Sequence, residues 1–220
     1  MITSHRNPTL QEVRRLLAKR ENGRFVAEGE DLVAAADEAG WEPVVRLRAG
    51  EDVTHDALAK VSALGSGSRE LAVYEERWGV PTGRLCVALW GVRDPGNVGT
   101  VLRGALAFGA ASVAIGPDTA DPYGPKAVRA SMGAVFAVPV ARVTALSDLP
   151  QPTVALVARE GEPLSRADAG TLVVGAERTG LPADVVAGCD RVRHIPIHSE
   201  SLNAAMAATI ALYEVSRTHA

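Results

Sequence analysis

The sequence contains few residues of the kinds that build metal sites, disulfide frameworks or membrane spans. Among 220 residues there are 2 cysteines and 5 histidines, and neither Cys86 nor Cys189 has a CxxC partner or a histidine at ligand spacing. Reduced, structural thiols are therefore favoured over a disulfide bridge or a zinc site, and no metal is expected. No stretch of about 18 or more apolar residues occurs, which argues against a transmembrane helix. The first residues, MITSHRNP, lack an apolar signal region, so a cytoplasmic protein is expected.

The overall charge does not mark a nucleic-acid-binding protein, but its distribution is uneven. The formal net charge is −3, which alone argues mildly against a nucleic-acid partner. A local basic face can nevertheless hold a phosphate backbone when the whole chain is acidic, and a solvated helix surface is the alternative explanation. Between Met1 and Ala27, basic residues outnumber acidic ones. They are Arg6, Arg14, Arg15, Lys19, Arg20 and Arg24.

Short strands and helices alternate along the first 78 residues. The segment Asn7–Arg20 is predicted to be a helix, because its apolar residues repeat on one side and its basic residues lie largely on the other. The other expected elements are strands at 24–27, 43–47 and 71–74 and helices at 31–39 and 56–64. This alternation indicates a small α/β domain. Gly and Pro then cluster, so residues 1–78 are expected to form one domain, 79–84 a linker and 85–220 a second domain.

The second domain reads as a larger α/β unit with a candidate ligand site. Apolar runs predict buried strands at 85–90, 112–115, 135–140, 153–158, 171–174 and 191–195. Helices are expected to begin near Asn97, at Pro125 and after Ser201, with Ser201 in an N-cap position and Asn97 as a candidate cap. Two strands end at Gly175 and Pro196, close to the expected start of the last helix. In α/β proteins such a convergence is a usual ligand site.

Three segments together carry a resemblance to a known family. The first, WGVRDPGNVGTVLRGALAFGA, contains Asn97, Gly99 and Arg103. The second, VVGAERTGL, contains Gly175, Glu177, Gly180 and Leu181, and the third, HIPIHSESLN, contains Ile195, Pro196, Ser201, Leu202 and Asn203. In this order they resemble the signature motifs of the SpoU (TrmH-like) family of RNA ribose 2′-O-methyltransferases, within the SPOUT class. The resemblance covers roughly residues 85–214, and residues 121–140 also resemble the family.

The resemblance implies a fold, a reaction and partners. The fold is the SPOUT α/β-knot, a trefoil-knotted parallel sheet, preceded here by a small N-terminal α/β domain that resembles the RNA-binding domain of many SpoU enzymes. The implied reaction transfers a methyl group from S-adenosylmethionine to a ribose 2′-hydroxyl, in a homodimer with the site near the subunit interface. Ribosomal RNA, with 23S RNA as the first candidate, is favoured over transfer RNA. A transfer-RNA 2′-O-methyltransferase and a non-catalytic RNA-binding dimer stay open as alternatives.

The resemblance also assigns residues. Arg103 matches the catalytic arginine, and because a guanidinium is almost never neutral in proteins, we expect it to clamp a phosphate and steady the ribose. Asn97, Glu177, Ser201 and Asn203 are expected to orient Arg103, the ribose and the loops. The implied cofactor-binding residues are Val157, Ala158, Gly175, Ala176, Glu177, Gly180, Ile195, Ile197, Ser201 and Leu202. RNA contacts are expected from Asn7 and the basic residues of the first segment, and Lys126 and Arg129 are predicted to grip phosphates or a neighbouring subunit, with a solvent-facing pair as the alternative.

Some features depart from the family pattern or exclude other enzymes. Arg178 stands where many members have glycine, and Ile197 stands where they commonly have methionine. Only three residues separate Ile197 from Ser201, fewer than in many relatives. These changes are expected to reshape the rim of the pocket. No GxGxxG follows a strand with an acidic residue about 20 positions on, which disfavours a nicotinamide-dependent dehydrogenase.

Overall fold

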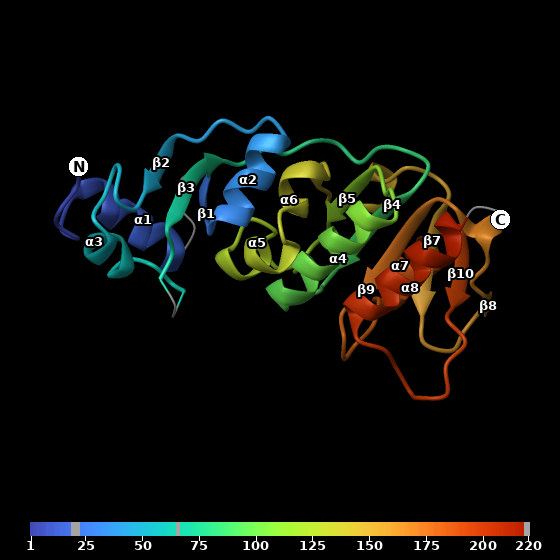
Figure 1. Ribbon diagram of the computed structural model, residues 1–220. Coiled ribbons are helices and arrows are strands. Elements are labelled where there is room, and N and C mark those ends of the chain that lie inside the picture. The colour runs from blue at the N-terminus through green and yellow to red at the C-terminus, as the bar shows by residue number, and fades with distance from the viewer. Residues whose placement is uncertain (19–22, 65–66, 218–220) are drawn as a thin grey trace.

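Two β-sheets lie towards opposite ends of an elongated molecule in the computed structural model, which describes residues 1–18, 23–64 and 67–217 (Figure 1). The first sheet has three antiparallel strands in the order β1-β3-β2. The second has seven strands in the order β6-β5-β4-β9-β7-β10-β8, and all of its strand pairs are parallel. The parallel α/β architecture expected from the alternating pattern is therefore present.

The N-terminal sheet carries its helices in the order that the sequence predicts. The elements are α1 (Pro8–Ala18), β1 (Arg24–Glu28), α2 (Glu30–Glu38), β2 (Val45–Arg48), α3 (His55–Ala59) and β3 (Glu70–Glu75). Helix α1 begins after Asn7, whose side-chain oxygen accepts a hydrogen bond from the Thr9 N–H at 2.9 Å, as an N-cap does. Leu10, Val13 and Leu16 of α1 are buried in a small apolar core against β1, β2 and β3.

The larger sheet is built from the remaining two thirds of the chain. Its elements are β4 (Cys86–Trp90), α4 (Pro95–Ala107), β5 (Ser112–Ile115), α5 (Pro125–Ser131), α6 (Ala134–Ala137), β6 (Val140–Arg142), η1 (Leu146–Asp148), β7 (Thr153–Val157), β8 (Glu162–Pro163), η2 (Arg166–Asp168), β9 (Thr171–Gly175), α7 (Ala183–Gly188), β10 (Arg191–His194) and α8 (Ala204–Ser216). The expectation missed β8 and α7, because a two-residue strand and a six-residue helix carry almost no periodic signal.

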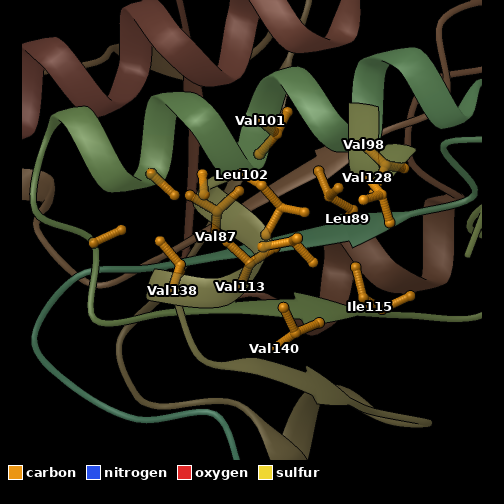
Figure 2. Packing of buried hydrophobic residues seen from close by; sticks show 14 of the residues in the cluster. Val87, Leu89, Val98, Val101, Leu102, Val113, Ile115, Val128, Val138 and Val140 are labelled. Atoms are coloured by element: carbon orange, nitrogen blue, oxygen red, sulfur yellow. The ribbon is translucent and has the colours of Figure 1, made fainter. Parts of the chain in front are cut away.

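Both faces of the parallel sheet are covered, which explains why its strands read as continuous apolar runs. On one face, α4 places Val98, Val101 and Leu102 over the side chains of β4 and β5 (Figure 2). Helix α8 lies beside α4 and contacts β9. On the other face, η1 and α7 cover a second apolar cluster that includes Cys86 and Trp90. Both cysteines are free thiols.

The predicted strand at 135–140 is wrong. Residues 134–137 form the short helix α6, and the strand β6 begins only at Val140. Tertiary contacts explain the difference, because the Phe136 carbonyl accepts a hydrogen bond from the Trp41 indole at 2.9 Å. Val135 and Phe136 are buried in the core at the junction of the two sheets.

An aromatic cluster joins the two halves of the chain. Phe25, Trp41 and Tyr74 come from the N-terminal unit, and Tyr123 and Phe136 come from the larger one. The ring centroids of Phe25 and Tyr123 are 4.8 Å apart, and those of Trp41 and Phe136 are 5.2 Å apart. Aromatic pairs at such distances contribute about 0.5–1.5 kcal/mol each beyond their buried area. This packing holds the two sheets together, and the division into domains at 78 and 85 stays a prediction.

The predicted linker is tied to the larger sheet. The Gly79 N–H donates to the Val140 carbonyl at 2.8 Å. Just before it, the Tyr123 hydroxyl donates to the Arg77 carbonyl, and the Trp78 ring packs edge-on against Tyr123 with centroids 5.1 Å apart. These contacts limit movement of the N-terminal unit relative to the larger sheet.

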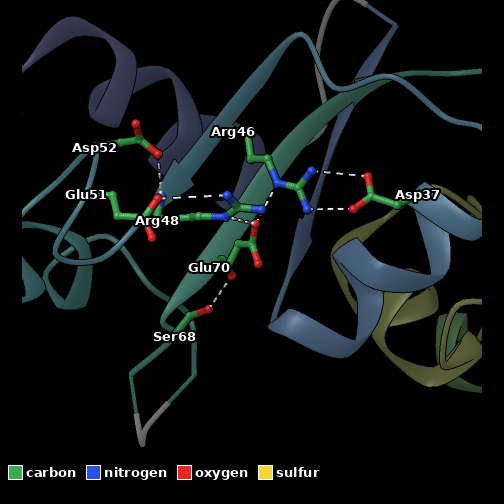
Figure 3. Close-up of polar contacts among 7 residues, drawn as sticks. All are labelled: Asp37, Arg46, Arg48, Glu51, Asp52, Ser68 and Glu70. Carbon is green, nitrogen blue, oxygen red and sulfur yellow. Dashed lines mark hydrogen bonds and ion pairs between the residues drawn. The ribbon is translucent and has the colours of Figure 1, made fainter.

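A polar network fixes α2 to the edge of the N-terminal sheet (Figure 3). Arg46 on β2 donates to the Asp37 carboxylate through two nitrogens, at 2.6 and 3.2 Å, and to Glu70 through Nε at 2.6 Å. Arg48 also donates to Glu70, at 2.9 Å. Burial raises the pKa of Glu70, but the hydrogen bonds from Arg46 and Arg48 outweigh burial and hold that pKa below its usual range. The network therefore favours the ionised form of Glu70.

We expect Glu70→Gln to lower the free energy of unfolding at pH 7 by about 1–3 kcal/mol, because it removes a nearly buried charged acceptor. The folded-state pKa of Glu70 is depressed, so its contribution is present above the unfolded-state pKa of about 4.3 and disappears as pH falls through the folded-state pKa. Urea denaturation between pH 3 and pH 7 measures the difference. The control is Glu51→Gln, an exposed residue 3.8 Å from Arg48. A Glu70→Gln deficit that persists unchanged at low pH contradicts the assignment.

Candidate active site

A cavity of about 800 Å³ opens at the carboxyl ends of β7, β9 and β10 and beside the N-terminus of α8. Pockets that bind small molecules commonly enclose roughly 300–1,000 Å³. Its walls are apolar side chains such as Leu156, Val186 and Ile195, and its rim carries Arg159, Glu160 and Arg178. The strand ends therefore converge on one cavity, as the glycine and proline breaks in the sequence suggested.

All ten residues expected to bind the cofactor lie in the lining of this cavity. They come from the loop after β7, the loop after β9 and the segment between β10 and α8. Sequence reasoning missed lining residues of two kinds. Arg159, Arg178 and Thr179 directly follow predicted positions and could have been found by extending the motifs. The α7 side chains and Cys189 carried no signal, because their place in the wall depends on how α7 folds over the loop.

The loop after β9 is a tight hairpin that forms one side of the cavity. The backbones of Ala176 and Gly180 exchange hydrogen bonds of 3.2 and 2.9 Å, and Gly180 has a φ of +67°. The returning chain passes so close to Gly175 that a Cβ there would lie 2.4 Å from the Gly180 carbonyl carbon and from the Leu181 nitrogen. Gly175 is therefore required by close backbone approach.

Three side chains from the three motif segments form one hydrogen-bonded chain. The Asn97 side-chain amide donates to the Glu177 carboxylate at 2.5 Å. The Asn203 side-chain amide donates to the Asn97 side-chain oxygen at 3.1 Å, and the Asn203 oxygen accepts from the N–H groups of Ala205 and Met206. Each side chain thus fixes the rotamer of the next, and the loop after β9 is held to the first turns of α4 and α8.

One expected helix cap is corrected, and capping by Asn97, the alternative to its role in the site, is not observed. The N-cap of α4 is Asp94, whose carboxylate accepts from the Gly96 N–H at 2.6 Å, so Asn97 does not cap the helix. The N-cap of α8 is Asn203 instead of Ser201. Asparagine caps a helix as well as serine does, and the later start leaves Ser201 and Leu202 in an extended segment that lines the cavity.

Arg103 lies outside the lining of the cavity. It is exposed on α4, one turn beyond Thr100, and within the described residues its side chain makes no hydrogen bond or ion pair. A second cavity of about 360 Å³ lies between α4 and α8, lined by Asn97, Thr100, Asn203, Ala205, Met206, Thr209 and Ile210. Asn97 and Asn203 line this second cavity and connect it to the first through Glu177. Arg103 is therefore placed next to the second cavity.

The residues expected to contact RNA fall into four groups. Arg6, Arg14, Arg15 and Arg129 are exposed, whereas Lys19 and Arg20 lie outside the described residues. Arg24 forms an ion pair with Glu12 at 3.1 Å, and Lys126 forms one with Asp94 at 2.9 Å. Asn7 caps α1. The hydrogen bond from Lys126 to Asp94 lowers the pKa of that carboxyl. Arg24 and Lys126 must therefore leave an existing partner before they contact a phosphate.

The arrangement of side chains also bears on metal binding, cysteine nucleophiles and membrane insertion. In the part of the chain that the structure describes, no group of three or more His, Cys, Asp or Glu side chains is arranged to hold a metal ion. Burial raises the pKa of the Cys189 thiol at the cavity wall, so this thiol is protonated and a poor nucleophile. Among the described helices, not one has both the length and the apolar character that crossing a bilayer requires.

With this geometry established, the chain can be compared with known proteins. The model of the SpoU rRNA Methylase family matches residues 84–213. This chain belongs to that family. Its parallel α/β sheet and the three hydrogen-bonded motif segments are the features expected of a SpoU member, and the family predicted from the sequence is confirmed. The trefoil knot stays a prediction.

Relatives of known name support the family. The 23S rRNA (guanosine(2553)-2′-O)-methyltransferase RlmP of Bacillus subtilis is 29% identical over 248 aligned residues, covering 97% of this chain and 98% of that protein. The ribosomal RNA small subunit methyltransferase G 2 of Syntrophobacter fumaroxidans is 41% identical over 160 residues, which cover 68% of this chain but 30% of that longer protein.

Solved structures agree over nearly the whole chain. The AdoMet-bound rRNA methyltransferase of Sinorhizobium meliloti superimposes with a TM-score of 0.85 at 29% identity, covering 97% of this chain and 96% of the other. The SpoU methyltransferase AviRb of Streptomyces viridochromogenes, in complex with AdoMet, gives a TM-score of 0.82 at 26% identity, covering 96% of this chain and 97% of the other. Because both matches include the N-terminal unit, the arrangement of the two sheets is shared.

We expect Gly175→Ala to weaken the binding of S-adenosylmethionine, the ligand that the sequence predicts for this cavity, by more than about ten-fold. The added Cβ would overlap the backbone at Gly180 and Leu181 and push the hairpin into the cavity. Titration calorimetry measures the affinity, and circular dichroism confirms that the variant is folded. The control is Gly79→Ala, where the nearest atom to an added Cβ is 3.7 Å away. Equal affinities for Gly175→Ala and the wild type contradict this role of Gly175.

Proposed function

We propose that this protein transfers a methyl group from S-adenosylmethionine to a ribose 2′-hydroxyl of ribosomal RNA, with 23S RNA as the first candidate. The observation that carries the proposal is the hydrogen-bonded chain through Asn203, Asn97 and Glu177, which joins the three SpoU motifs at the mouth of a cavity of about 800 Å³. The full-length relative RlmP, named as a 23S rRNA 2′-O-methyltransferase, supports this choice of substrate over transfer RNA.

The cavity suits S-adenosylmethionine in size and chemistry. The adenine ring needs apolar walls and backbone hydrogen-bonding groups, since it carries no charge. Ile195, Ile197 and Leu202 supply the apolar walls, and the segments around Val157 and Ala176 expose backbone near strand ends. When bound, S-adenosylmethionine supplies an activated methyl group on a sulfonium, which is already a good leaving group. The protein has to align the reacting groups and control one proton.

In this proposal Arg103 acts on the RNA and not on the cofactor. Its guanidinium is exposed and has no partner among the described residues, so it is free to bind a phosphate next to the reactive ribose. A bidentate arginine–phosphate contact fixes the position of the sugar and stabilises negative charge that develops at the 2′-oxygen. The proton leaves to water or to phosphate, because a guanidinium is a poor base.

Asn97, Asn203 and Glu177 have a positioning role. Glu177 accepts from Asn97, so it is not a free carboxylate that could remove the ribose proton. The hydrogen bonds among these three side chains keep the hairpin after β9 and the N-terminus of α8 at a fixed separation. Ser201 lines the cavity between them. Preorganised groups of this kind need no rearrangement during the reaction.

The N-terminal unit is proposed to capture folded RNA and present it to the cavity. Arg14 and Arg15 are exposed on α1 and have no partner among the described residues. The aromatic contacts between the sheets, and the hydrogen bond from Gly79 to Val140, fix the distance between α1 and the cavity. A large folded RNA can span that distance, which favours ribosomal RNA as the substrate.

The protein is also proposed to form a homodimer through α4 and α8. Leu106, Met206, Ile210 and Tyr213 are large apolar side chains that are 48%, 55%, 38% and 53% exposed. Met206 and Ile210 also line the second cavity, and Leu106 lies on α4 one turn beyond Arg103. A second copy of this chain suits this surface, because the same apolar face on both subunits can pair about a two-fold axis. The dimer would then cover Arg103 and bring it close to a cofactor cavity.

We expect Arg103→Ala to reduce methyl transfer at least about 100-fold while S-adenosylmethionine binds as in the wild type. The measurements are transfer of tritium-labelled methyl to total RNA and titration calorimetry. Arg103→Lys keeps the charge without the bidentate geometry and should recover only part of the activity. Arg84→Ala removes an exposed arginine at the amino end of β4 and serves as the control. Full turnover by Arg103→Ala overturns the role, and absence of transfer by the wild type to any ribosomal or transfer RNA supports the non-catalytic RNA-binding alternative.

We expect Ile210→Asp to convert a wild-type dimer into a monomer, because it places an unpaired charge in an apolar interface. Light scattering after gel filtration gives the mass, and circular dichroism confirms folding. The matched control is Val80→Asp, which changes a valine that is 72% exposed and lies between β3 and β4, outside α4 and α8. A monomeric wild type, or a dimer that survives Ile210→Asp, excludes this interface.

A further inference from the structure

Three arginines that the sequence did not assign to the site lie at one edge of the parallel sheet. Arg93 follows β4, Arg178 follows β9 and Arg159 follows β7, each within three residues of the strand's end. The three strands are neighbours in the order β4-β9-β7 and run parallel, so their carboxyl ends lie at the same edge. Neighbouring strands are about 4.8 Å apart, so the row begins on a backbone span of about 10 Å.

All three guanidinium groups are available for a ligand. Each residue is exposed, and within the described residues no side-chain hydrogen bond or ion pair engages any of them. The acidic residues next to two of them are occupied elsewhere. Asp94 pairs with Lys126, and Glu177 accepts from Asn97. Glu160 is the exposed acid beside Arg159, and Glu177 keeps its charge because the Asn97 amide is neutral, so three arginines and two glutamates leave the row a net charge of +1.

The backbone holds each arginine in place. The hairpin closed by the Ala176 and Gly180 hydrogen bonds carries Arg178 at its tip. The loop with Arg159 returns to β10 at Gly161, where a Cβ would lie 2.2 Å from the Val192 carbonyl oxygen, so the loop packs against that strand. Arg93 lies between Val92, whose carbonyl accepts from Ala120, and the helix cap Asp94. Anchored loops reduce the entropy lost when these side chains bind a ligand.

We propose that Arg93, Arg178 and Arg159 form a phosphate-binding row that holds the backbone of the substrate RNA across the mouth of the cavity. This inference rests on the proposed function. A line of guanidinium groups matches a chain of phosphates, because each can donate two hydrogen bonds to one phosphate group. Arg159 and Arg178 also line the cavity, so RNA bound to them covers the cofactor and lies with its ribose facing the cavity. The row gives affinity without sequence preference, since phosphates carry no base information.

The experiment compares two charge-matched double variants of the full chain. Arg93→Gln/Arg178→Gln removes two members of the row, and Arg69→Gln/Arg84→Gln removes two exposed arginines away from it. The probe is fluorescently labelled, deproteinised 23S ribosomal RNA, titrated at several salt concentrations. We expect the first variant to bind RNA on the order of ten-fold more weakly at 0.1 M salt, and its logarithmic salt slope to fall by about 0.7 per arginine. Adding Arg159→Gln should lower both further.

Arg93→Gln alone changes no residue of the cavity lining, so its affinity for S-adenosylmethionine and its turnover at saturating RNA should stay within about two-fold of the wild type, while its KM for RNA rises. A loss of S-adenosylmethionine affinity in Arg93→Gln overturns the proposal, because it assigns this arginine to the cofactor. Equal RNA affinity in both double variants overturns it too. RNA binding that depends on the row without any methyl transfer by the wild type supports the row and refutes the proposed reaction. A wild type that binds no RNA refutes both.

Discussion

Three side chains from distant parts of the sequence meet in a hydrogen-bonded chain at the carboxyl edge of the parallel sheet. Asn97 sits between Glu177 and Asn203, so it fixes the hairpin after β9 and the start of α8 at once. A hydrogen bond to a carboxylate contributes about 1.5–3 kcal/mol when it is partly buried. The cavity depends on these hydrogen bonds, because they connect the hairpin after β9 and the start of α8, which both line it.

The chain can form because other groups take over the capping of the helices. Asp94 caps α4, which leaves the Asn97 amide free to reach Glu177. Asn203 does two things with one side chain, since its oxygen caps α8 while its amide donates to Asn97. The site therefore contains two sets of side chains. The hydrogen-bonded polar residues hold the backbone in position, and the exposed arginines would bind RNA under the proposed function.

The N-terminal unit packs against the larger sheet through a shared core. The aromatic cluster around Phe25, Tyr123 and Phe136 makes the boundary between the sheets part of the core. Under the proposed function, an RNA held by α1 would be presented at a fixed distance, whereas a flexible linker would leave that distance variable. The elongated molecule in Figure 1 would then suit a large folded substrate, whose contacts far from the reacting ribose would contribute to its alignment.

The residues around the cavity were predicted from the resemblance of the motifs to the SpoU family, since lining residues and core residues look alike in a sequence. The amino-acid sequence by itself determined most of the strands and helices, because apolar runs and the breaks at Gly175 and Pro196 are local features. It misplaced the segment 135–140, which a hydrogen bond from Trp41 and a shared core turn into α6. It also placed the cap of the last helix at Ser201 instead of Asn203, since a side chain with two possible partners is decided by what lies nearby in space. Tertiary structure alone decided that Lys126 and Arg24 are paired, that Arg103 is free, and that arginines from three separate loops share one edge. Ion pairs and strand order join residues far apart in the chain, and periodicity carries no record of them.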